Sequence, residues 1–161
     1  MPVLAPGSVA PAFSLLDQSG KPFRFQPGKG RPLILEFYCE DDSGGCVTEN
    51  QEFSDLVPEF ARLGFDVVAV SPQDVASHRK FADKYGFIHR LLADPDLAAI
   101  RPYGLWAQKK LWGREFMGVL RVTYIIDKAG KIVAAIPARK IKGHAAKVLD
   151  AAAASLASDP T

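Results

Sequence analysis

A strand, a helix and a second strand follow one another between residues 32 and 71, and this unit limits the folds open to the chain. The segment Pro32–Tyr38 is almost entirely apolar, as expected for a strand buried in the middle of a sheet. Apolar residues then recur at helical spacing up to Gly64, which is placed to end the helix; they are Phe53, Leu56, Val57, Phe60 and Leu63. A second apolar segment, Phe65–Ser71, predicts another buried strand. Strands that alternate with helices predict an α/β domain.

The remaining patterns extend this alternation along the chain. The predicted strands are 11–17 and 22–26, which form an opening β-hairpin, then 90–93, and then 122–127 paired with 131–136. The predicted helices are 75–86, a short stretch near 96–103, and 144–157. We therefore expect one three-layer domain over residues 1–161, with a central mixed β-sheet flanked by helices and an N-terminal β-hairpin.

Size, charge and cysteine content narrow the class of protein further. Basic and acidic side chains nearly balance, at 20 and 18, so no nucleic-acid or membrane partner is indicated. No apolar run approaches the roughly 18 residues that cross a bilayer, and the start of the chain from Met1 lacks the features of a signal peptide. Two cysteines are too few for a disulfide-stapled secreted scaffold. We therefore expect a cytoplasmic protein. We also expect no cofactor or metal; the three histidines lack a metal-ligand spacing.

The loop between the first buried strand and the following helix carries the residues best suited to chemistry. Cys46 lies in the first turn of that helix, where free backbone N–H groups and a partial positive charge favour a thiolate. Ser43 is placed to cap the helix and to offer its hydroxyl to a bound oxygen, and Gly44–Gly45 let the backbone approach a small ligand. An inert buried thiol behind a capping serine explains the same spacing equally well. The carboxylates of Glu40–Asp42, expected to be exposed and screened, oppose a thiolate only modestly.

With its surroundings, this loop resembles the active-site loop of the peroxiredoxins of the AhpC/TSA family, where a Pro, a Thr and the peroxide-reducing Cys are spaced P-x-x-x-T-x-x-C. The similarity is greatest to the bacterioferritin comigratory protein (PrxQ) branch. Ordered matches cover most of the chain: Ala10–Leu15, Val70–Gly86, Leu91–Asp96, Tyr103–Gly118 and Arg121–Asp127. The resemblance implies a thioredoxin-like fold.

The same resemblance implies a thiol peroxidase that reduces hydrogen peroxide and small organic hydroperoxides, with thioredoxin or a similar thiol as reductant. Cys46 takes the place of the Cys that becomes a sulfenic acid, and Ser43 that of the Thr. Arg121 matches the family's essential Arg, which stabilises the thiolate and polarises the peroxide; alone it would be a salt-bridge residue. Glu49 matches the branch's Thr-x-Glu neighbourhood, although a capping-box residue at position N3 explains it equally well. A monomer or small homodimer is implied.

Two positions depart from the family pattern. Cys39 stands where the family has its Pro, and Gln51 stands where many members of the branch have a second Cys. Because the family's Pro packs against the reactive thiol, we predict that Cys39 is the resolving cysteine and forms a disulfide with oxidised Cys46. The alternative is that Cys39 only replaces the Pro and an external thiol resolves Cys46. A degenerate peroxiredoxin, acting as a redox sensor or binding module with little turnover, also stays open.

Other functions of a reactive cysteine have less support. The chain lacks a C-x-x-C motif and has no Pro before Thr123, which argues against a thioredoxin-like disulfide carrier. No general-base histidine is identified, which argues against a cysteine hydrolase. Trp106 and Phe116 are assigned to the core or to a pocket wall.

Overall fold

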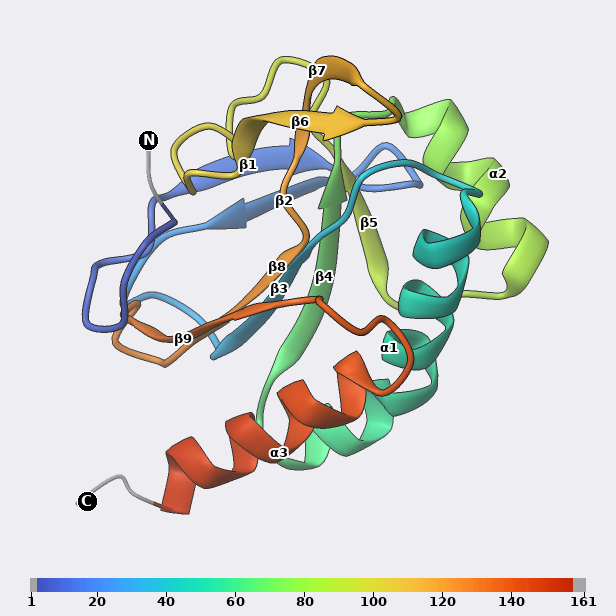
Figure 1. Cartoon of the computed structure of the whole chain (residues 1–161). Coiled ribbons are helices and arrows are strands. Elements are labelled where there is room, and N and C mark those ends of the chain that lie inside the picture. Colours follow the sequence, from blue (N-terminus) through green and yellow to red (C-terminus); the bar gives the residue numbers. More distant parts are fainter. Residues whose placement is uncertain (1–2, 158–161) are drawn as a thin grey trace.

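The computed structural model describes residues 3–157, which form a seven-stranded mixed sheet, a separate two-stranded hairpin and three helices (Figure 1). The strand order in the large sheet is β2-β1-β5-β4-β3-β8-β9. The bounds are β1 (Phe13–Leu16), β2 (Pro22–Phe25), β3 (Leu33–Phe37), α1 (Gly44–Arg62), β4 (Asp66–Ser71), α2 (Val75–Tyr85), β5 (Arg90–Ala93), β6 (Trp106–Leu111), β7 (Arg114–Val119), β8 (Val122–Ile126), β9 (Ile132–Pro137) and α3 (His144–Ala157). Met1 and Pro2, where the expectation about a signal peptide begins, lie outside the described residues.

The strand–helix–strand unit forms the centre of the sheet. Strands β3 and β4 pair in parallel, with Leu33 opposite Asp66, and β4 pairs in parallel with β5. Strand β8 runs antiparallel to β3, with Glu36 opposite Thr123, and β9 runs antiparallel to β8. The N-terminal hairpin β1–β2 joins the other edge through an antiparallel contact with β5. The predicted mixed sheet and opening hairpin are therefore confirmed.

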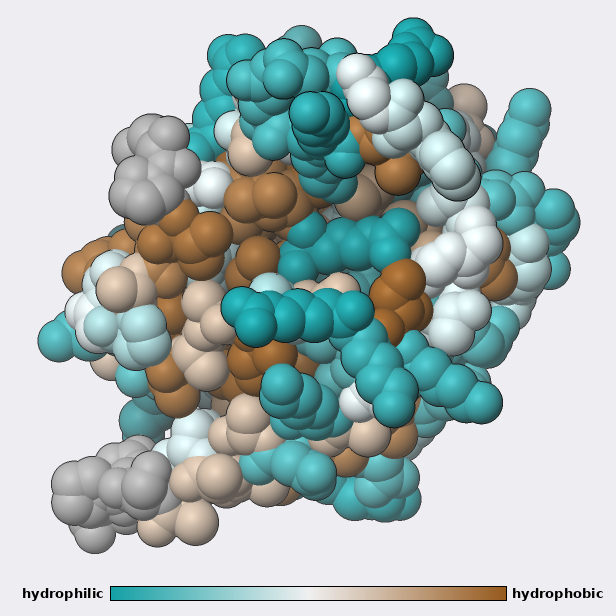
Figure 2. All heavy atoms as spheres, in the orientation of Figure 1, coloured by the Kyte–Doolittle hydropathy of each residue, from teal (hydrophilic) through white to brown (hydrophobic). Residues whose placement is uncertain are grey.

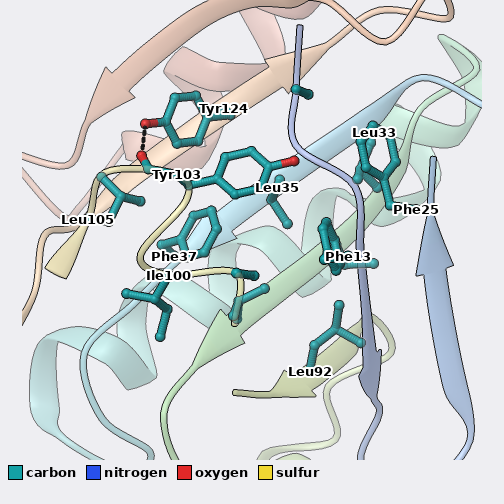
Figure 3. Packing of buried hydrophobic residues seen from close by; sticks show 14 of the residues in the cluster. Phe13, Phe25, Leu33, Leu35, Phe37, Leu92, Ile100, Tyr103, Leu105 and Tyr124 are labelled. Carbon is teal, nitrogen blue, oxygen red and sulfur yellow. Dashed lines mark hydrogen bonds between the residues drawn. The ribbon is translucent and has the colours of Figure 1, made fainter. Parts of the chain in front are cut away.

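The sheet separates two main apolar clusters. On one side, Ile34 of β3 packs with residues of α1 and α3, including Phe53 and Val148. On the other side, Leu35 and Phe37 pack with the N-terminal hairpin and with the segment before β6; Figure 3 shows the Tyr103 and Tyr124 rings beside Phe37. The Tyr124 hydroxyl donates to the Tyr103 carbonyl oxygen at 2.6 Å, so the buried phenol has a partner.

The short helix predicted near 96–103 is wrong, because this segment forms successive turns. The Asp94 carboxylate accepts from the backbone N–H groups of Ala98, Ala99 and Ile100 at 2.7, 2.9 and 2.8 Å. Leu97 has a positive φ of 59°, which a continuous right-handed helix does not allow. A side chain that binds several successive N–H groups competes with the helical pattern, and here it replaces that pattern.

The β6–β7 hairpin was not predicted from the sequence. It turns at Trp112 and Gly113, whose φ values of 55° and 75° suit a tight turn between twisted strands. Figure 1 places the hairpin over one end of the main sheet, and hydrophilic residues cover this region in Figure 2. Among residues 3–157, no helix is both long enough and apolar enough to cross a membrane.

Candidate active site

The loop that follows β3 leads directly into α1 and carries the predicted site. Ser43 occupies the N-cap position in an extended conformation, with φ −82° and ψ 148°, as predicted. Its side chain makes no capping bond, which corrects the expected role of the hydroxyl. The hydroxyl instead donates to the Glu40 carbonyl oxygen at 3.1 Å.

Cys46 lies in the first turn of α1 with 0% exposure, and its thiol contacts Arg121. Arg121 directly precedes β8, and the antiparallel pairing of β8 with β3 brings it to the end of β3 where the loop begins. Its Nη2 donates to Cys46 Sγ at 3.3 Å. A Cβ atom on Gly45 would lie 2.8 Å from Arg121 Nη1, so the glycine permits the guanidinium to rest on the first turn.

Cys39 lies beside Cys46 and shares its arginine. Arg121 Nε donates to Cys39 Sγ at 3.4 Å while Nη2 contacts Cys46, so one planar guanidinium bridges the two sulfurs. Lys109 Nζ, from β6, lies 3.2 Å from Cys39 Sγ. A protonated Cys39 thiol donates to the Val119 carbonyl oxygen at 3.3 Å. Lys109 was not predicted, because nothing in its sequence neighbourhood marks a lysine that reaches residue 39.

The two thiols titrate as a pair that keeps one proton over a wide pH range. A hydrogen bond from the Cys46 thiol lowers the pKa of Cys39 to about 5, and Arg121 and Lys109 act in the same direction against burial. The same hydrogen bond, together with burial, raises the pKa of Cys46. The Ser43 hydroxyl and the Glu40 backbone oppose this rise; since a hydroxyl has one hydrogen, Ser43 donates either to the sulfur or to the Glu40 carbonyl oxygen. The pair therefore holds a thiolate at neutral pH, with the charge favoured on Cys39.

Glu49 lies too far along α1 for a capping box, because the helix begins at Gly44 and position N3 is Cys46. Its carboxyl group is instead buried against that of Glu36 from β3, with exposures of 1% and 0%. Both carboxyl groups interact electrostatically with Cys46 and Arg121. Glu36 was not identified from the sequence, although a lone carboxylate within a strand that is buried along its length was the available signal.

The acidic loop is held by a hydrogen-bond network, which corrects the expectation that all three of its carboxylates are exposed. The Asp41 side chain is only 6% exposed and contacts His78 Nδ1 at 2.6 Å, the Tyr38 hydroxyl at 2.6 Å and the Ser77 hydroxyl at 2.7 Å. These hydrogen bonds outweigh burial and lower the pKa of Asp41. Asp42 is exposed and pairs with Lys84 at 2.8 Å. His78, which the sequence left without a role, thus ties the loop to α2.

A hollow of about 240 Å³ opens in front of Cys39. Its residues come from the loop, from the segment after β4 and from the β6–β7 hairpin: Cys39, Glu40, Pro72, Gln73, Trp106, Lys109, Phe116, Met117, Gly118 and Val119. The sequence assigned Trp106 and Phe116 to the core or to a pocket wall, and in the structure they line this hollow. Cys46 is not among the residues that line the hollow.

The chain is similar to known proteins in sequence and in fold. The family model described as the AhpC/TSA family matches residues 6–135. Peroxiredoxin Bcp of Bacillus subtilis is 34% identical over 143 residues, which cover 89% of this chain and 91% of that protein. Peroxiredoxin Bcp of Xanthomonas campestris is 36% identical over 122 residues, 76% of each chain. A solved structure of Xanthomonas campestris peroxiredoxin Q has a TM-score of 0.82 at 33% identity and covers 88% of this chain and 90% of its own.

These matches extend along most of the chain, and the fold they share is the thioredoxin-like fold expected above. The chain therefore belongs to the AhpC/TSA family and is a peroxiredoxin of the Bcp/PrxQ type.

Proposed function

We propose that this peroxiredoxin reduces peroxides at Cys46 and resolves the product with Cys39. The observation that carries the proposal is the Arg121 guanidinium, which donates to Cys46 Sγ at 3.3 Å and to Cys39 Sγ at 3.4 Å. A guanidinium in this position stabilises a thiolate on either sulfur and the negative charge that develops on a peroxide oxygen. The two sulfurs and the cation supply the groups that a thiol peroxidase needs.

The first step uses the proton that the two thiols share. When that proton moves from Cys46 to Cys39, Cys46 becomes the thiolate. Its sulfur attacks the terminal oxygen of the hydroperoxide, the S–O bond forms, the O–O bond breaks, and the sulfur is oxidised to a sulfenic acid. The leaving alkoxide takes the proton from Cys39, which becomes a thiolate in turn.

The second step joins the two cysteines. The Cys39 thiolate attacks the sulfenic sulfur of Cys46, a disulfide forms, and hydroxide leaves and is protonated to water. Lys109, at 3.2 Å from Cys39 Sγ, favours the thiolate that this step requires. Ser43 is placed to hold a peroxide oxygen once its hydroxyl turns from the Glu40 carbonyl oxygen towards Cys46.

The substrates are hydrogen peroxide and small organic hydroperoxides. The hollow in front of Cys39 has apolar walls in Trp106 and Phe116 and one cation, Lys109. A small alkyl group fits against such walls while the peroxide oxygens face Lys109. One solved relative, the bacterioferritin comigratory protein of Xanthomonas campestris, is described for its alkyl peroxide reduction activity.

The reductant is thioredoxin or a similar thiol. Cys39 lines the hollow whereas Cys46 is fully buried, so an incoming thiolate attacks the Cys39 sulfur and releases Cys46. A monomer or small homodimer is the expected assembly.

A coupled peroxidase assay tests the function. Purified protein, hydrogen peroxide and a thioredoxin system should consume NADPH well above the rate of the Cys46→Ser variant. A second-order rate constant with peroxide no better than that of free cysteine would instead support the redox-sensor alternative.

Peptide mapping tests the resolving role. After one equivalent of peroxide, the wild type should yield a peptide that links Cys39 to Cys46, and Cys39→Ser should accumulate a sulfenic acid on Cys46. If the wild type shows no such link and Cys39→Ser turns over equally well with thioredoxin, an external thiol resolves Cys46.

One observation favours the reverse sequence of steps, in which Cys39 attacks the peroxide first and Cys46 resolves. Cys39 lines the hollow and contacts both cations, whereas Cys46 is buried behind it. Trapping sulfenic acid with dimedone in the two single-cysteine variants distinguishes the orders. The variant that keeps the attacking cysteine is labelled rapidly, and the other is labelled slowly or not at all.

A further inference from the structure

Two carboxyl groups are buried together behind the sulfurs. Glu36 is the one charged residue of β3, between apolar neighbours, and its exposure is 0%. Glu49 approaches from α1 with 1% exposure. None of their four carboxyl oxygens has a hydrogen-bond partner elsewhere in the described residues 3–157. A buried carboxylate without a donor is strongly unfavourable, so this arrangement needs a physical explanation.

A proton held between the two groups supplies the missing donor. Two ionised carboxylates can only accept hydrogen bonds, whereas a protonated carboxyl donates one. The Glu36 and Glu49 carboxyl groups lie close enough to form that bond. Burial first, and then the like charge of Glu49, raise the pKa of Glu36 well above its usual range. Burial raises the pKa of Glu49 to about 7, while the hydrogen bond from Glu36 limits the rise.

We propose that Glu36 is a positioning residue: the proton that it shares with Glu49 determines the charge that Glu49 presents to Arg121 and Cys46. The proposal deepens the proposed peroxidase function and rests on it, because it concerns the charge balance around the same sulfurs. Glu36 itself contacts no reacting atom. It acts through Glu49, whose ionised form attracts the guanidinium and repels a thiolate on Cys46.

The charged and titratable groups around the pair come from four parts of the chain. Tyr38, directly after β3, interacts with Glu36, and burial raises the pKa of its hydroxyl, so it carries no charge near neutral pH. Helix α1 contributes Cys46 and Glu52 in addition to Glu49, and Arg121 precedes β8. From α3, His144 bonds to Thr123 at 2.9 Å, the residue opposite Glu36 on β8. Burial lowers the pKa of His144 to about 4, so near neutral pH it contributes no charge. Among these groups Glu49 is therefore the one that changes charge near neutral pH, because the cysteine pair already carries one negative charge there.

The rate constant with peroxide should therefore show a second step in its pH dependence, at the pH where Glu49 ionises. Below this step Glu49 is protonated, and the full charge of Arg121 acts on the sulfurs. Above it Glu49 is ionised and neutralises part of that charge, so each thiolate is less stabilised. The Glu36 hydrogen bond favours ionised Glu49, and its removal should move the step to higher pH by about one unit, the size expected for one hydrogen bond to a charged group.

Infrared spectroscopy of the resting protein tests the shared proton without any peroxide. At a pH about one unit above neutral, the wild type should show a carboxylic acid C=O band, since exposed carboxyl groups are then ionised. The band should be absent in Glu36→Gln. Because this measurement needs no turnover, it separates the proposal from a failure of the peroxidase function. Absence of the band in the wild type, or its persistence in Glu36→Gln, would overturn the proposal, as would a tightly bound cation found by elemental analysis.

The pH profile of the peroxide rate constant tests the positioning role. Glu49→Gln should lose the step near neutral pH, and Glu36→Leu should shift it upward by about one unit. Glu36→Gln should keep it near the wild-type pH, because an amide N–H still donates to Glu49. If Glu36→Leu does not fold, the pH profiles of the two glutamine variants and the infrared band still test the proposal. A profile that is identical in the wild type and Glu49→Gln contradicts the proposal.

Discussion

Arg121 donates from Nε to Cys39 and from Nη2 to Cys46, and this fork joins residues that are 82 and 75 positions away from it along the chain. A fork of two parallel N–H donors is specific to arginine, since lysine presents a single ammonium group. The sequence identified Arg121, Cys39 and Cys46 as candidates, through the family resemblance. It did not indicate that one guanidinium would serve both sulfurs, because that depends on side-chain directions at the ends of β3 and β8.

Replacement of Arg121 tests the fork. We expect Arg121→Lys to raise the pKa of the cysteine pair by about one unit or more, because at least one hydrogen bond to a charged sulfur is lost. The rate with peroxide at neutral pH should fall at least about tenfold. Thiolate absorbance against pH and stopped-flow kinetics give the two values. Arg139→Lys, at an exposed position, is the matched control, and equal behaviour of the two variants would contradict a role for the fork.

The two glycines of the first turn provide a second test. A Cβ on Gly45 meets Arg121 Nη1 at 2.8 Å and Ile141 Cδ1 at 2.6 Å, whereas a Cβ on Gly44 meets nothing within 4 Å. Gly44→Ala should raise the free energy of unfolding by about 0.5–1 kcal/mol and leave the peroxide rate near wild type. Gly45→Ala should displace the guanidinium and lower the rate about tenfold. Equal rates in the two alanine variants would show that Arg121 adapts freely.

At the scale of elements, the active-site loop is fixed by contacts with its neighbours. Nδ1 of His78 on α2 faces the Asp41 carboxylate and Nε2 faces the Leu92 carbonyl oxygen at 2.9 Å, so both ring nitrogens lie against acceptors. The sequence predicted a helix over 75–86 that ends at Gly86, and α2 matches this prediction. It could not predict the contact between His78 and Asp41, which lie 37 residues apart in different elements.

Asp41→Asn should destabilise the protein in a pH-dependent way. At neutral pH we expect a loss of about 2 kcal/mol in the free energy of unfolding, since hydrogen bonds to a buried charged group are weakened. The pKa of Asp41 is lowered from 3.8 by its partners, so its contribution is complete above that value and disappears as the pH falls through the lower folded-state pKa. Urea unfolding of wild type and variant should therefore converge in acid.

Asp42→Asn is the control for this change. Its carboxylate is exposed and pairs with Lys84 at the surface, where solvent screens the charges, so we expect little or no change in the free energy of unfolding. A loss in Asp42→Asn as large as that in Asp41→Asn, or a difference between wild type and Asp41→Asn that persists in acid, would contradict the importance of the buried network.

At the scale of the whole molecule, the β6–β7 hairpin folds back over the end of the main sheet and completes the site. It supplies Lys109 to Cys39 and places Trp106 and Phe116 in the wall of the hollow. The hairpin connects the Tyr103 turn to β8 and so belongs to a part of the chain far from the cysteines in sequence. Without the tertiary structure, its lysines would be assigned to a solvated surface.

Lys109→Met tests this long-range contribution. Methionine keeps an unbranched side chain and removes the charge, so the pKa of Cys39 should rise by about one unit. Disulfide formation after oxidation should therefore slow at a pH near 5, where the variant has less Cys39 thiolate, as followed by intact-mass analysis over time. Lys110→Met, on the exposed side of the same strand, should behave as wild type. The two variants would behave alike if the contact between Lys109 and Cys39 had no electrostatic effect.

The sequence by itself determined the local structure of this protein. Strands such as β3 and helices such as α3 follow from hydrophobic periodicity and from turn residues, which act over a few neighbouring positions. The sequence also located Cys46, Ser43, Arg121 and Glu49, because the family motifs are contiguous. Local patterns were misleading at 96–103, where the Asp94 carboxylate binds three backbone N–H groups and replaces the helical pattern with turns.

Only the tertiary structure decided which ionisable groups lie close enough to change one another's pKa. Three contacts depend on how β3, α1, α2 and the β6–β7 hairpin pack together. They join Cys39 to Lys109, Glu36 to Glu49, and Asp41 to His78. Electrostatic interactions depend on distance in space and on burial, neither of which a linear pattern encodes. The titration of the candidate site is therefore a property of the folded molecule, although its cysteines and Arg121 could be identified as candidates from the sequence.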